Sequence, residues 1–309
     1  MFSSIFFGNS DFCLPSLNVL YQKTNLKLIL TGEDKPIGRG MKSLKVPEPK
    51  KFALAHNIDF IQGYEFDDNV LDRINSIKPD IMIVISYGKI IPKNVYEIPR
   101  IGTFNIHASI LPKYRGASPI HEALINGDKK TGVTIQRIND KIDNGNIVYL
   151  KEIDILSEDN YLTLRDKLAA LSADALSEFL DIAENGSIIE KTQEGPVSYC
   201  RKIKKEDALI YWDRDTTDII LNKYRAFILW PNIYTFYKGK KIILTEIGRY
   251  NKKLSLDIPG SISIENKKMI VKTIDGAISI EKIKPENSRE MSSGEFINGY
   301  KIKNGEVLG

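Results

Sequence analysis

The feature that most constrains the fold is the run from Asp80 to Ser86, in which five consecutive apolar residues lie between two polar ones. A strand that is apolar on both faces is typical of a parallel sheet covered by helices. Helical and strand-like patterns alternate around this run, so the sequence predicts an α/β fold with a doubly wound, mostly parallel sheet. Strands are expected at 3–8, 26–30, 58–61, 80–86, from 104, at 131–138 and 147–155, and helices at 14–23, from 47, at 66–77, 117–127 and 161–184.

The C-terminal third follows a different pattern, and a chain of 309 residues is long enough for two domains. Gly239, Asn266 and the hairpin pair Asp275-Gly276 separate short β-like runs. This spacing predicts a small β-barrel, of which the oligonucleotide-binding (OB) type is one form. A helix is expected near 216–228, and strands at 234–237, 241–247, 260–264, 269–273 and 277–283. The expected domains are a catalytic domain at 1–188, a linker at 189–206 and a C-terminal β-barrel domain at 207–309.

Positive charge is concentrated in the C-terminal third. Residues 1–199 hold 23 Lys/Arg and 26 Asp/Glu, whereas residues 200–309 hold 21 Lys/Arg and 14 Asp/Glu. This asymmetry suggests an anionic partner for the C-terminal part, with nucleic acid as the first candidate. A solvated lysine-rich surface explains the same counts, so charge alone leaves both interpretations open.

The composition also bears on the compartment. No apolar run approaches the roughly 20 residues of a membrane-spanning helix, and the first residues lack the basic start and long apolar core of a signal peptide. Cys13 and Cys200 are too few and too far apart for a disulfide framework or a cysteine metal site. We therefore expect a cytoplasmic protein without membrane contact. A monomer is expected as well, although the composition does not bear on it.

A long basic segment separates the second expected strand from the next helix. Residues 34–47 contain Gly38 and Gly40, and we expect an irregular, flexible connection. Connections of this length in compact α/β domains are usually functional or disordered, and an arginine can bind phosphate through two hydrogen bonds. A mobile solvent loop accounts for the same pattern. The basic side chains of the segment are Lys35, Arg39, Lys42 and Lys45.

Asn105 and His107 are the candidate catalytic residues with the most informative surroundings. They lie two residues apart, so in a strand they share one face, and Pro112 breaks the segment soon after. Open α/β sheets bind ligands at the carboxyl ends of their strands. Asp143, in a turn between two expected strands, could reach the same place and orient the imidazole. By contrast, His56 and His121 are expected to be structural.

These residue types fit direct transfer of an acyl group to an amine. An asparagine can donate a hydrogen bond to an oxyanion, and a histidine beside a carboxylate can move a proton. No activated serine or cysteine nucleophile lies beside Asn105, His107 and Asp143, hereafter the catalytic trio. From residue chemistry alone, a structural polar cluster remains the alternative.

Two motifs resemble those of the formyltransferases that use 10-formyltetrahydrofolate. Residues 105–120 resemble the signature of this family, and Asp143-Asn144-Gly145 resembles its Asp-x-Gly motif. The chain departs from the usual pattern at Ile110 and Asn146, neither of which changes the catalytic trio. The resemblance covers nearly the whole chain, including Phe7-Gly8, Asp11-Phe12, residues 36–40, Ser86-Tyr87-Gly88, Ile91-Pro92, Arg225-Ala226-Phe227 and Trp230-Pro231.

Within this family the chain resembles the enzymes that formylate the amino group of initiator methionyl-tRNA for translation initiation. The resemblance implies 10-formyltetrahydrofolate as the formyl donor, and no metal. Asn105 and protonated His107 would stabilise the oxyanion, and Asp143 would hold His107 and an ordered water. The segment around Arg39 would reach the acceptor stem, and the basic barrel would support the tRNA. The residues implied in binding are Ser109, Ile110, Leu111, Pro112, Tyr87, Gly88 and Ile91 for the folate, and Arg39, Lys42 and Lys35 for the tRNA.

Four other functions compete with this interpretation. A sugar-nucleotide formyltransferase, which formylates an amino sugar, shares the trio and is the nearest alternative, but it has no need of the basic segment around Arg39. A glycinamide ribonucleotide formyltransferase is usually the catalytic domain alone, which residues 207–309 argue against. A folate-binding hydrolase should lack the basic second domain. A non-catalytic RNA-binding protein on the same fold has no need of an intact catalytic trio.

Overall fold

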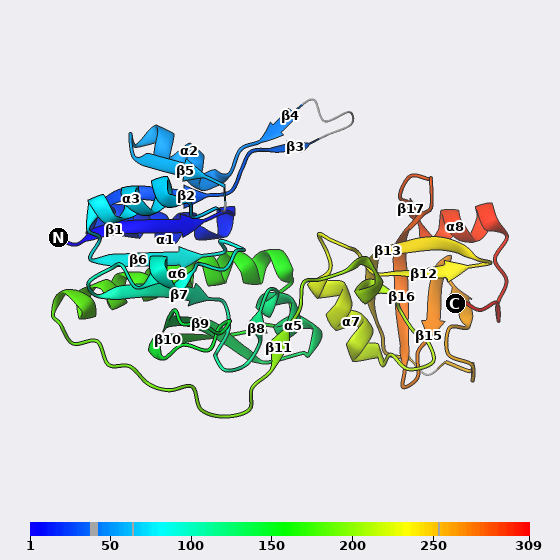
Figure 1. The fold of residues 1–309 in the computed structure, drawn as a ribbon. Coiled ribbons are helices and arrows are strands. Elements are labelled where there is room, and N and C mark those ends of the chain that lie inside the picture. The colour runs from blue at the N-terminus through cyan, green and yellow to red at the C-terminus, as the bar shows by residue number, and fades with distance from the viewer. Residues whose placement is uncertain (38–42, 64, 253) are drawn as a thin grey trace. The chain divides into compact units, whose positions relative to one another are not determined.

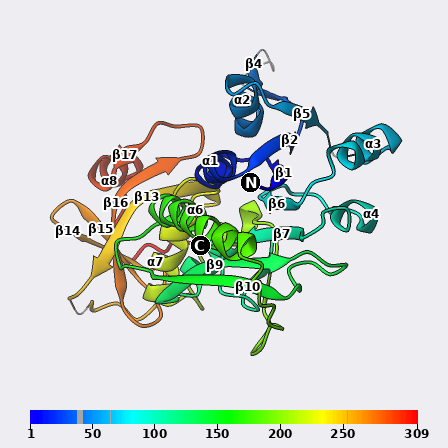
Figure 2. The same ribbon diagram turned by 90° about the vertical axis from the view of Figure 1, so that its left-hand side faces the viewer.

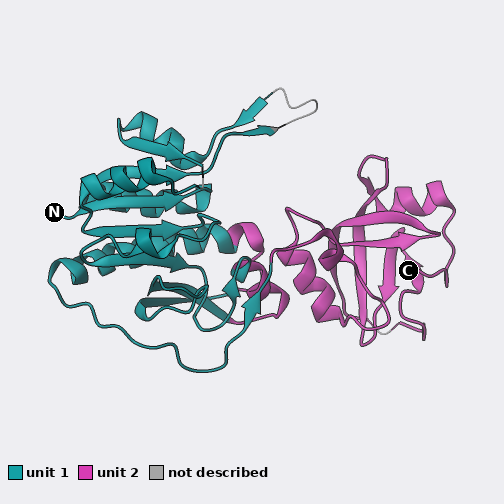
Figure 3. Ribbon diagram, in the orientation of Figure 1, with its two compact units in different colours: residues 1–119, 130–155, 164–201 teal, residues 120–129, 156–163, 202–309 magenta. Residues whose placement is uncertain are grey.

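The chain folds into two compact units (Figure 3). The computed structural model describes residues 1–37, 43–63, 65–252 and 254–309. The functional domain boundaries expected at 188 and 207 remain a prediction. In the structure, the unit that contains the C-terminal residues also includes two short segments from earlier in the chain. Unit 1 consists of residues 1–119, 130–155 and 164–201, and unit 2 of residues 120–129, 156–163 and 202–309.

Unit 1 is built on a seven-stranded sheet with the order β10-β9-β7-β6-β1-β2-β5 (Figure 1). The five strands from β7 to β5 are parallel, and β9 and β10 are antiparallel to their neighbours. Every residue of β6 is buried, as its apolar run predicts. The doubly wound, mostly parallel sheet is thus confirmed. Its strands are β1 (Ser3–Gly8), β2 (Asn25–Thr31), β5 (Asp59–Gln62), β6 (Ile81–Ile85), β7 (Gly102–His107), β9 (Lys130–Arg137) and β10 (Ile147–Asp154).

Helices cover both faces of this sheet. Figure 2 shows α1 and α6 on one face and α3 and α4 on the other. The long α6 packs its Phe179 ring edge-on against Phe104 of β7, with 4.8 Å between the ring centroids. The opposite face carries a core cluster that includes Met82, Ile74 and Tyr87. The helices are α1 (Leu14–Lys23), α2 (Glu48–Ala55), α3 (Asp68–Ile77), α4 (Lys93–Tyr96) and α6 (Tyr161–Glu184).

The basic segment 34–47 contains a two-stranded hairpin, where the sequence predicts only an irregular connection. Strands β3 (Lys35–Ile37) and β4 (Ser43–Lys45) pair antiparallel, with Lys35 opposite Lys45, and Figure 1 shows them extending away from the sheet of unit 1. Lys50 holds the start of the segment through an ion pair of 2.8 Å with Asp34. The prediction was wrong for these strands because three-residue strands show too few residues for an alternating apolar pattern. Arg39 and Lys42, with Gly38 and Gly40, lie outside the described residues.

Unit 2 contains a curled antiparallel sheet that forms a half-barrel, which agrees with the expected small OB-like β-barrel domain. The order is β12-β13-β16-β15-β14, and β17 pairs with β16. Helix α8 was not predicted, although Ser292 and Glu295 form a capping box at its start. The strands are β12 (Tyr234–Tyr237), β13 (Lys240–Tyr250), β14 (Ile262–Glu265), β15 (Lys268–Lys272), β16 (Ala277–Pro285) and β17 (Met291–Ser292), and the helices are α5 (Pro119–Ile125), α7 (Thr217–Ala226) and α8 (Ser293–Tyr300).

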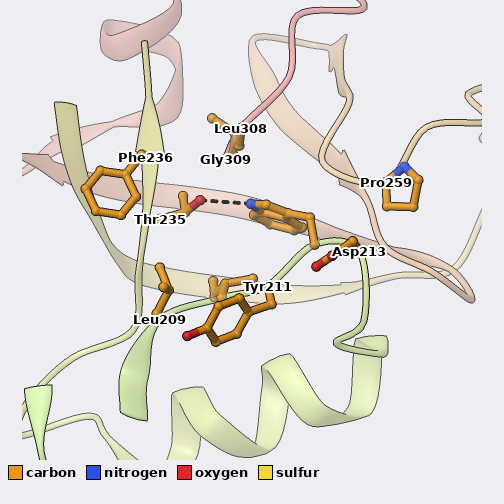
Figure 4. Close-up of a pocket in the computed structure, with 10 residues that line it drawn as sticks. Leu209, Tyr211, Asp213, Thr235, Phe236, Pro259, Leu308 and Gly309 are labelled. Atoms are coloured by element: carbon orange, nitrogen blue, oxygen red, sulfur yellow. Dashed lines mark hydrogen bonds between the residues drawn. The ribbon is translucent and has the colours of Figure 1, made fainter. Parts of the chain in front are cut away.

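A hollow in unit 2 is lined mainly by apolar and aromatic side chains. The indole Nε1 of Trp212 donates to Thr235 Oγ1 over 2.8 Å at its wall (Figure 4). The guanidinium of Arg214 lies 3.5 Å from the centroid of the neighbouring Tyr211 ring, in a cation–π contact. The residues expected to carry chemistry do not line this hollow. Its lining comprises Leu209, Ile210, Tyr211, Trp212, Asp213, Thr235, Phe236, Pro259, Leu308 and Gly309.

His121 of α5 packs as an aromatic residue inside unit 2. Its ring stacks on Tyr161 with 4.1 Å between the centroids and lies 6.1 Å from the Phe227 ring. Burial removes the imidazole from water and lowers its pKa to about 4. The folded protein therefore favours the neutral ring, as expected for a structural histidine.

This pKa predicts a loss of stability in mild acid. An unfolded histidine titrates near 6.5, so the unfolded chain binds the extra proton first as the pH falls from about 6.5 towards 4. Between pH 7.5 and pH 5 the free energy of unfolding should fall by about 2 kcal/mol through this group alone. Urea unfolding followed by the fluorescence of Trp212 and Trp230, which both lie in unit 2, measures it.

The control for this prediction is His121→Phe, which retains a stacking ring but cannot titrate. The variant should lose about 2 kcal/mol less than the wild type over the same pH range. An equal loss in both proteins would show that His121 does not cause the acid sensitivity.

Candidate active site

The last residues of β7 carry two of the predicted catalytic side chains to the carboxyl edge of the parallel strands. His107 ends β7 and is buried, and Asn105 is half-buried. The antiparallel pairing with β9 places Asn105 opposite Gln136 and His107 opposite Thr134. Because cross-strand partners point to the same face, the side chain of Gln136 joins this polar group.

The carboxylate of Asp143 lies at the centre of the group. Its Oδ1 accepts hydrogen bonds from Asn105 Nδ2 (3.2 Å) and Gln136 Nε2 (2.9 Å). Its Oδ2 accepts the Gly116 backbone N–H (2.8 Å) and lies 3.7 Å from His107 Nδ1. The structure thus brings together the three residues of the predicted catalytic trio.

The backbone fixes which nitrogen of His107 faces this carboxylate. Nε2 lies 2.9 Å from the carbonyl oxygen of Tyr114. A carbonyl oxygen can only accept, so Nε2 carries a proton in either charge state of the ring. Nδ1 is therefore the ring atom that faces Asp143 and is left for chemistry.

The segment after β7 is held by β9. Thr134 Oγ1 donates to Ser109 O (2.6 Å) and accepts the Leu111 N–H (3.1 Å). Ser109 Oγ donates to Lys113 O (2.6 Å), and the Leu111–Pro112 peptide bond is cis. Ser109, Leu111 and Pro112 are buried, and Ile110 is half-buried. A folate contact of this segment would therefore fall mainly on its backbone and on Ile110.

The other predicted folate residues follow β6. The side chains of Tyr87 and Ile91 are buried in the core cluster, whereas Gly88 is exposed at a φ of +79°. Contacts with a folate would thus involve the backbone around Gly88 rather than the side chains of Tyr87 and Ile91. Ile90, which sequence reasoning did not single out, exposes 79% of its surface here.

The predicted tRNA residues are only partly described. Lys35 is exposed in β3, and Arg39 and Lys42 lie outside the described residues. Across the described ranges no cluster of three or more His, Cys, Asp or Glu side chains is arranged to hold a metal ion. None of the helices in those ranges combines the length and apolar character that crossing a membrane requires.

Sequence reasoning missed the residues that support Asp143. Gln193 contacts the Asp143 turn, and β11 (Tyr199–Cys200) pairs in parallel with β8 (Arg115–Gly116). Both come from a stretch expected to be linker, whose sequence has no regular period. The role of Gln136 could have been predicted if the strand register had been assigned, because Gln136 pairs with Asn105. Gln193 had no local signal.

Comparisons with known proteins decide the family. The family described as Formyl transferase matches residues 5–180, and its C-terminal domain matches residues 202–301. A methionyl-tRNA formyltransferase of Thermodesulfovibrio yellowstonii is 42% identical over 305 residues, which covers 97% of each chain. The chain belongs to the methionyl-tRNA formyltransferases. Members of this family are enzymes that transfer formyl groups, and the family uses 10-formyltetrahydrofolate as donor.

Several solved structures with low sequence identity share the fold of this methionyl-tRNA formyltransferase. An N-formyltransferase from Helicobacter canadensis, in complex with folinic acid and dTDP-3-aminofucose, is 18% identical with a TM-score of 0.68, over 94% of this chain and 100% of that chain. HypX from Aquifex aeolicus in complex with tetrahydrofolic acid is 16% identical with a TM-score of 0.59, over 100% of this chain and 50% of that chain. These likenesses concern the fold alone.

The Asp143 turn predicts the effect of a single added methyl group. A Cβ atom at Gly145 would lie 1.6 Å from the carbonyl oxygen of Arg137, so Gly145→Ala must push the turn away from β9. We expect kcat of formyl transfer to fall about 100-fold, since displacing a catalytic group by about 1 Å has an effect of this size.

The control is Gly299→Ala in α8, where an added Cβ meets no atom within 4 Å. Alanine favours helix formation relative to glycine, so this variant should keep full activity and gain about 0.5–1 kcal/mol of stability. Full activity of Gly145→Ala would contradict the close packing of the turn.

Proposed function

We propose that Asn105, His107 and Asp143 form the catalytic centre with which the chain transfers a formyl group from 10-formyltetrahydrofolate to the free amino group of initiator methionyl-tRNA. The observation that carries the proposal is the convergence of Asn105 Nδ2 and His107 Nδ1 on the two oxygens of one carboxylate. Membership of the methionyl-tRNA formyltransferases supports the substrates.

The reaction needs charge stabilisation and one proton transfer. The methionyl amine attacks the formyl carbon, and the carbonyl oxygen becomes an oxyanion. Asn105 Nδ2 and the Nδ1–H of a protonated His107 are the available donors to that oxygen. Asp143 Oδ2 lies 3.7 Å from Nδ1, which is beyond hydrogen-bond distance but on the side of the ring that would carry the reactive proton.

The products follow when the tetrahedral carbon expels the folate nitrogen N10. The amine must lose one proton and N10 must gain one, so the reaction is balanced without an external acid. His107 Nδ1 can supply the proton to N10, and Asp143 can accept the amine proton through an ordered water. The Tyr114 carbonyl keeps the ring oriented throughout, because Nε2–H remains bonded to it.

The folate would lie along two loops at the carboxyl edge of the sheet. Residues 109–112 offer a backbone whose shape is fixed by Thr134. The backbone from Tyr87 to Ile91 would face the pterin, with Gly88 allowing close approach. In this arrangement, Ile110 and Ile90 supply apolar contact.

The tRNA would be bound through basic side chains. Lys35 in β3, together with Arg39 and Lys42 in the same segment, would contact the acceptor stem, and the excess of Lys/Arg in residues 200–309 supports a second contact region. We also place the reaction in the cytoplasm and propose a monomer. Neither Cys13 nor Cys200 forms a disulfide, and both are buried, which agrees with a reducing compartment.

An assay with two acceptors tests this function directly. The purified chain with 10-formyltetrahydrofolate should formylate methionyl-tRNA and leave amino-sugar nucleotides unchanged. Formylation of an amino-sugar nucleotide alone would replace the proposal by its nearest alternative.

His107→Ala should lower kcat by about 10²–10⁴-fold, because it removes the general acid and an oxyanion donor, while the Kd for methionyl-tRNA stays within about twofold.

The matched control for this variant is His56→Ala. His56 is exposed and packs against the Phe52 ring at 4.2 Å, far along the chain from β7. Its kcat should equal that of the wild type. If His107→Ala retained wild-type turnover, His107 would not be the catalytic histidine.

Phosphate contacts predict a steep salt dependence of tRNA binding. Each contact releases condensed counterions, so log K should fall linearly with log[salt], and Arg39→Ala should reduce the magnitude of the slope by about 1. Lys27→Ala is the control: Lys27 is exposed in β2 outside the basic segment, and its removal should leave the slope unchanged. Filter binding between 50 and 200 mM salt measures both, and a flat salt dependence would contradict an electrostatic interface.

A further inference from the structure

We propose that Gln193 is a positioning residue for formyl transfer, which holds the turn that carries Asp143 and acts on the reaction only through that carboxylate. The inference rests on the proposed function of the catalytic trio. Gln193 lies 50 residues beyond Asp143 in the chain, in a stretch that sequence reasoning expects to be a linker. Its side-chain amide is nevertheless part of the site's hydrogen-bond network.

The amide nitrogen of Gln193 bridges two backbone carbonyls of the turn. Nε2 donates to Asp143 O (3.0 Å) and to Gly145 O (2.9 Å). Asp143 itself has a φ of +49°, in the left-handed region that residues with a side chain rarely adopt. A conformation of this kind persists where surrounding contacts hold it, and Gln193 supplies two such contacts.

Arg115 fixes which end of the Gln193 amide faces the turn. Its Nε and Nη2 lie 3.0 and 2.7 Å from Gln193 Oε1. A guanidinium can only donate and the two turn carbonyls can only accept, so both ends of the amide require the same orientation. Arg115 is 6% exposed, so little water competes for Oε1. The amide is thus locked with its two donor hydrogens towards the turn.

A second amide connects this turn to the reactive carboxylate. Gln136 Nε2 donates to Asp143 Oδ1 (2.9 Å), while Gln136 Oε1 accepts the Gly145 N–H (3.1 Å) and lies 3.3 Å from Gln193 Nε2. Gln136 therefore holds the carboxylate of Asp143, and Gln193 holds the backbone carbonyls of the turn that carries this carboxylate. Removing the Gln193 donor takes away two of the bonds that hold the turn, which loosens the position of Asp143 Oδ2 relative to His107 Nδ1.

The test uses Gln193→Glu, which keeps the shape and the acceptor for Arg115 but cannot donate to the two carbonyls. We expect kcat of formyl transfer to methionyl-tRNA to fall about 10- to 100-fold, as for other residues that orient a catalytic group, with KM for both substrates within about threefold. The matched control is Asn146→Ala. It removes the 3.1 Å bond from Asn146 to Glu190, another link between the same turn and the same stretch that does not reach Asp143. Its kcat should stay within about twofold of the wild type.

A double-mutant cycle separates positioning from a structural role. If Gln193 acts through Asp143, adding Gln193→Glu to Asp143→Asn should lower single-turnover kcat by less than about twofold. Losses that multiply, or a Gln193→Glu enzyme with wild-type kcat, would overturn the proposal. If the Gln193→Glu variant does not fold, Gln193→Met takes its place. Failure of both variants to fold would assign Gln193 a purely structural role and would also overturn the proposal. A wild-type enzyme that does not formylate methionyl-tRNA would instead refute the proposed function.

Discussion

The register of β7 against β9 is the constraint on which the site depends. It sets Asn105 opposite Gln136, so that an amide from each strand meets the carboxylate of the following turn. A slip of one residue would turn every side chain of β7 to the other face and remove His107 from the site. Strand β9, which runs antiparallel to β7, thereby adds a polar side chain to the site at the edge of a largely apolar sheet.

Much of the fold could be predicted from the sequence. The expected helix at 161–184 has the bounds of α6, and the strand expected at 80–86 is the central strand β6, whose residues 81–85 are all buried. Long segments with a clear period are predictable because their burial pattern is repeated many times. The convergence of Asn105 and His107 on Asp143 was also predictable, from strand periodicity and the position of a turn.

The remainder depends on contacts that no local pattern encodes. Gln193 reaches a turn 50 residues away, and its neighbours in sequence show no periodicity. Tyr87 stays a predicted folate residue through its backbone, but the burial of its ring in the core cluster could not be predicted, because a loop residue can turn its side chain inwards while its backbone stays at the edge. The start of α8 carried a signal, the Ser292–Glu295 capping box, that could have been read.

The division of the chain into units has a consequence for any attempt to isolate its parts. Helix α7 is held by segments from much earlier in the sequence: Arg225 donates to the carbonyls of Leu156, Ser157 and Asp159, and Asn222 donates to Ile125 O. A fragment that begins at residue 202 would leave both segments behind. The C-terminal unit is therefore continuous in space but interrupted in sequence, and a single cut in the gene cannot release it whole.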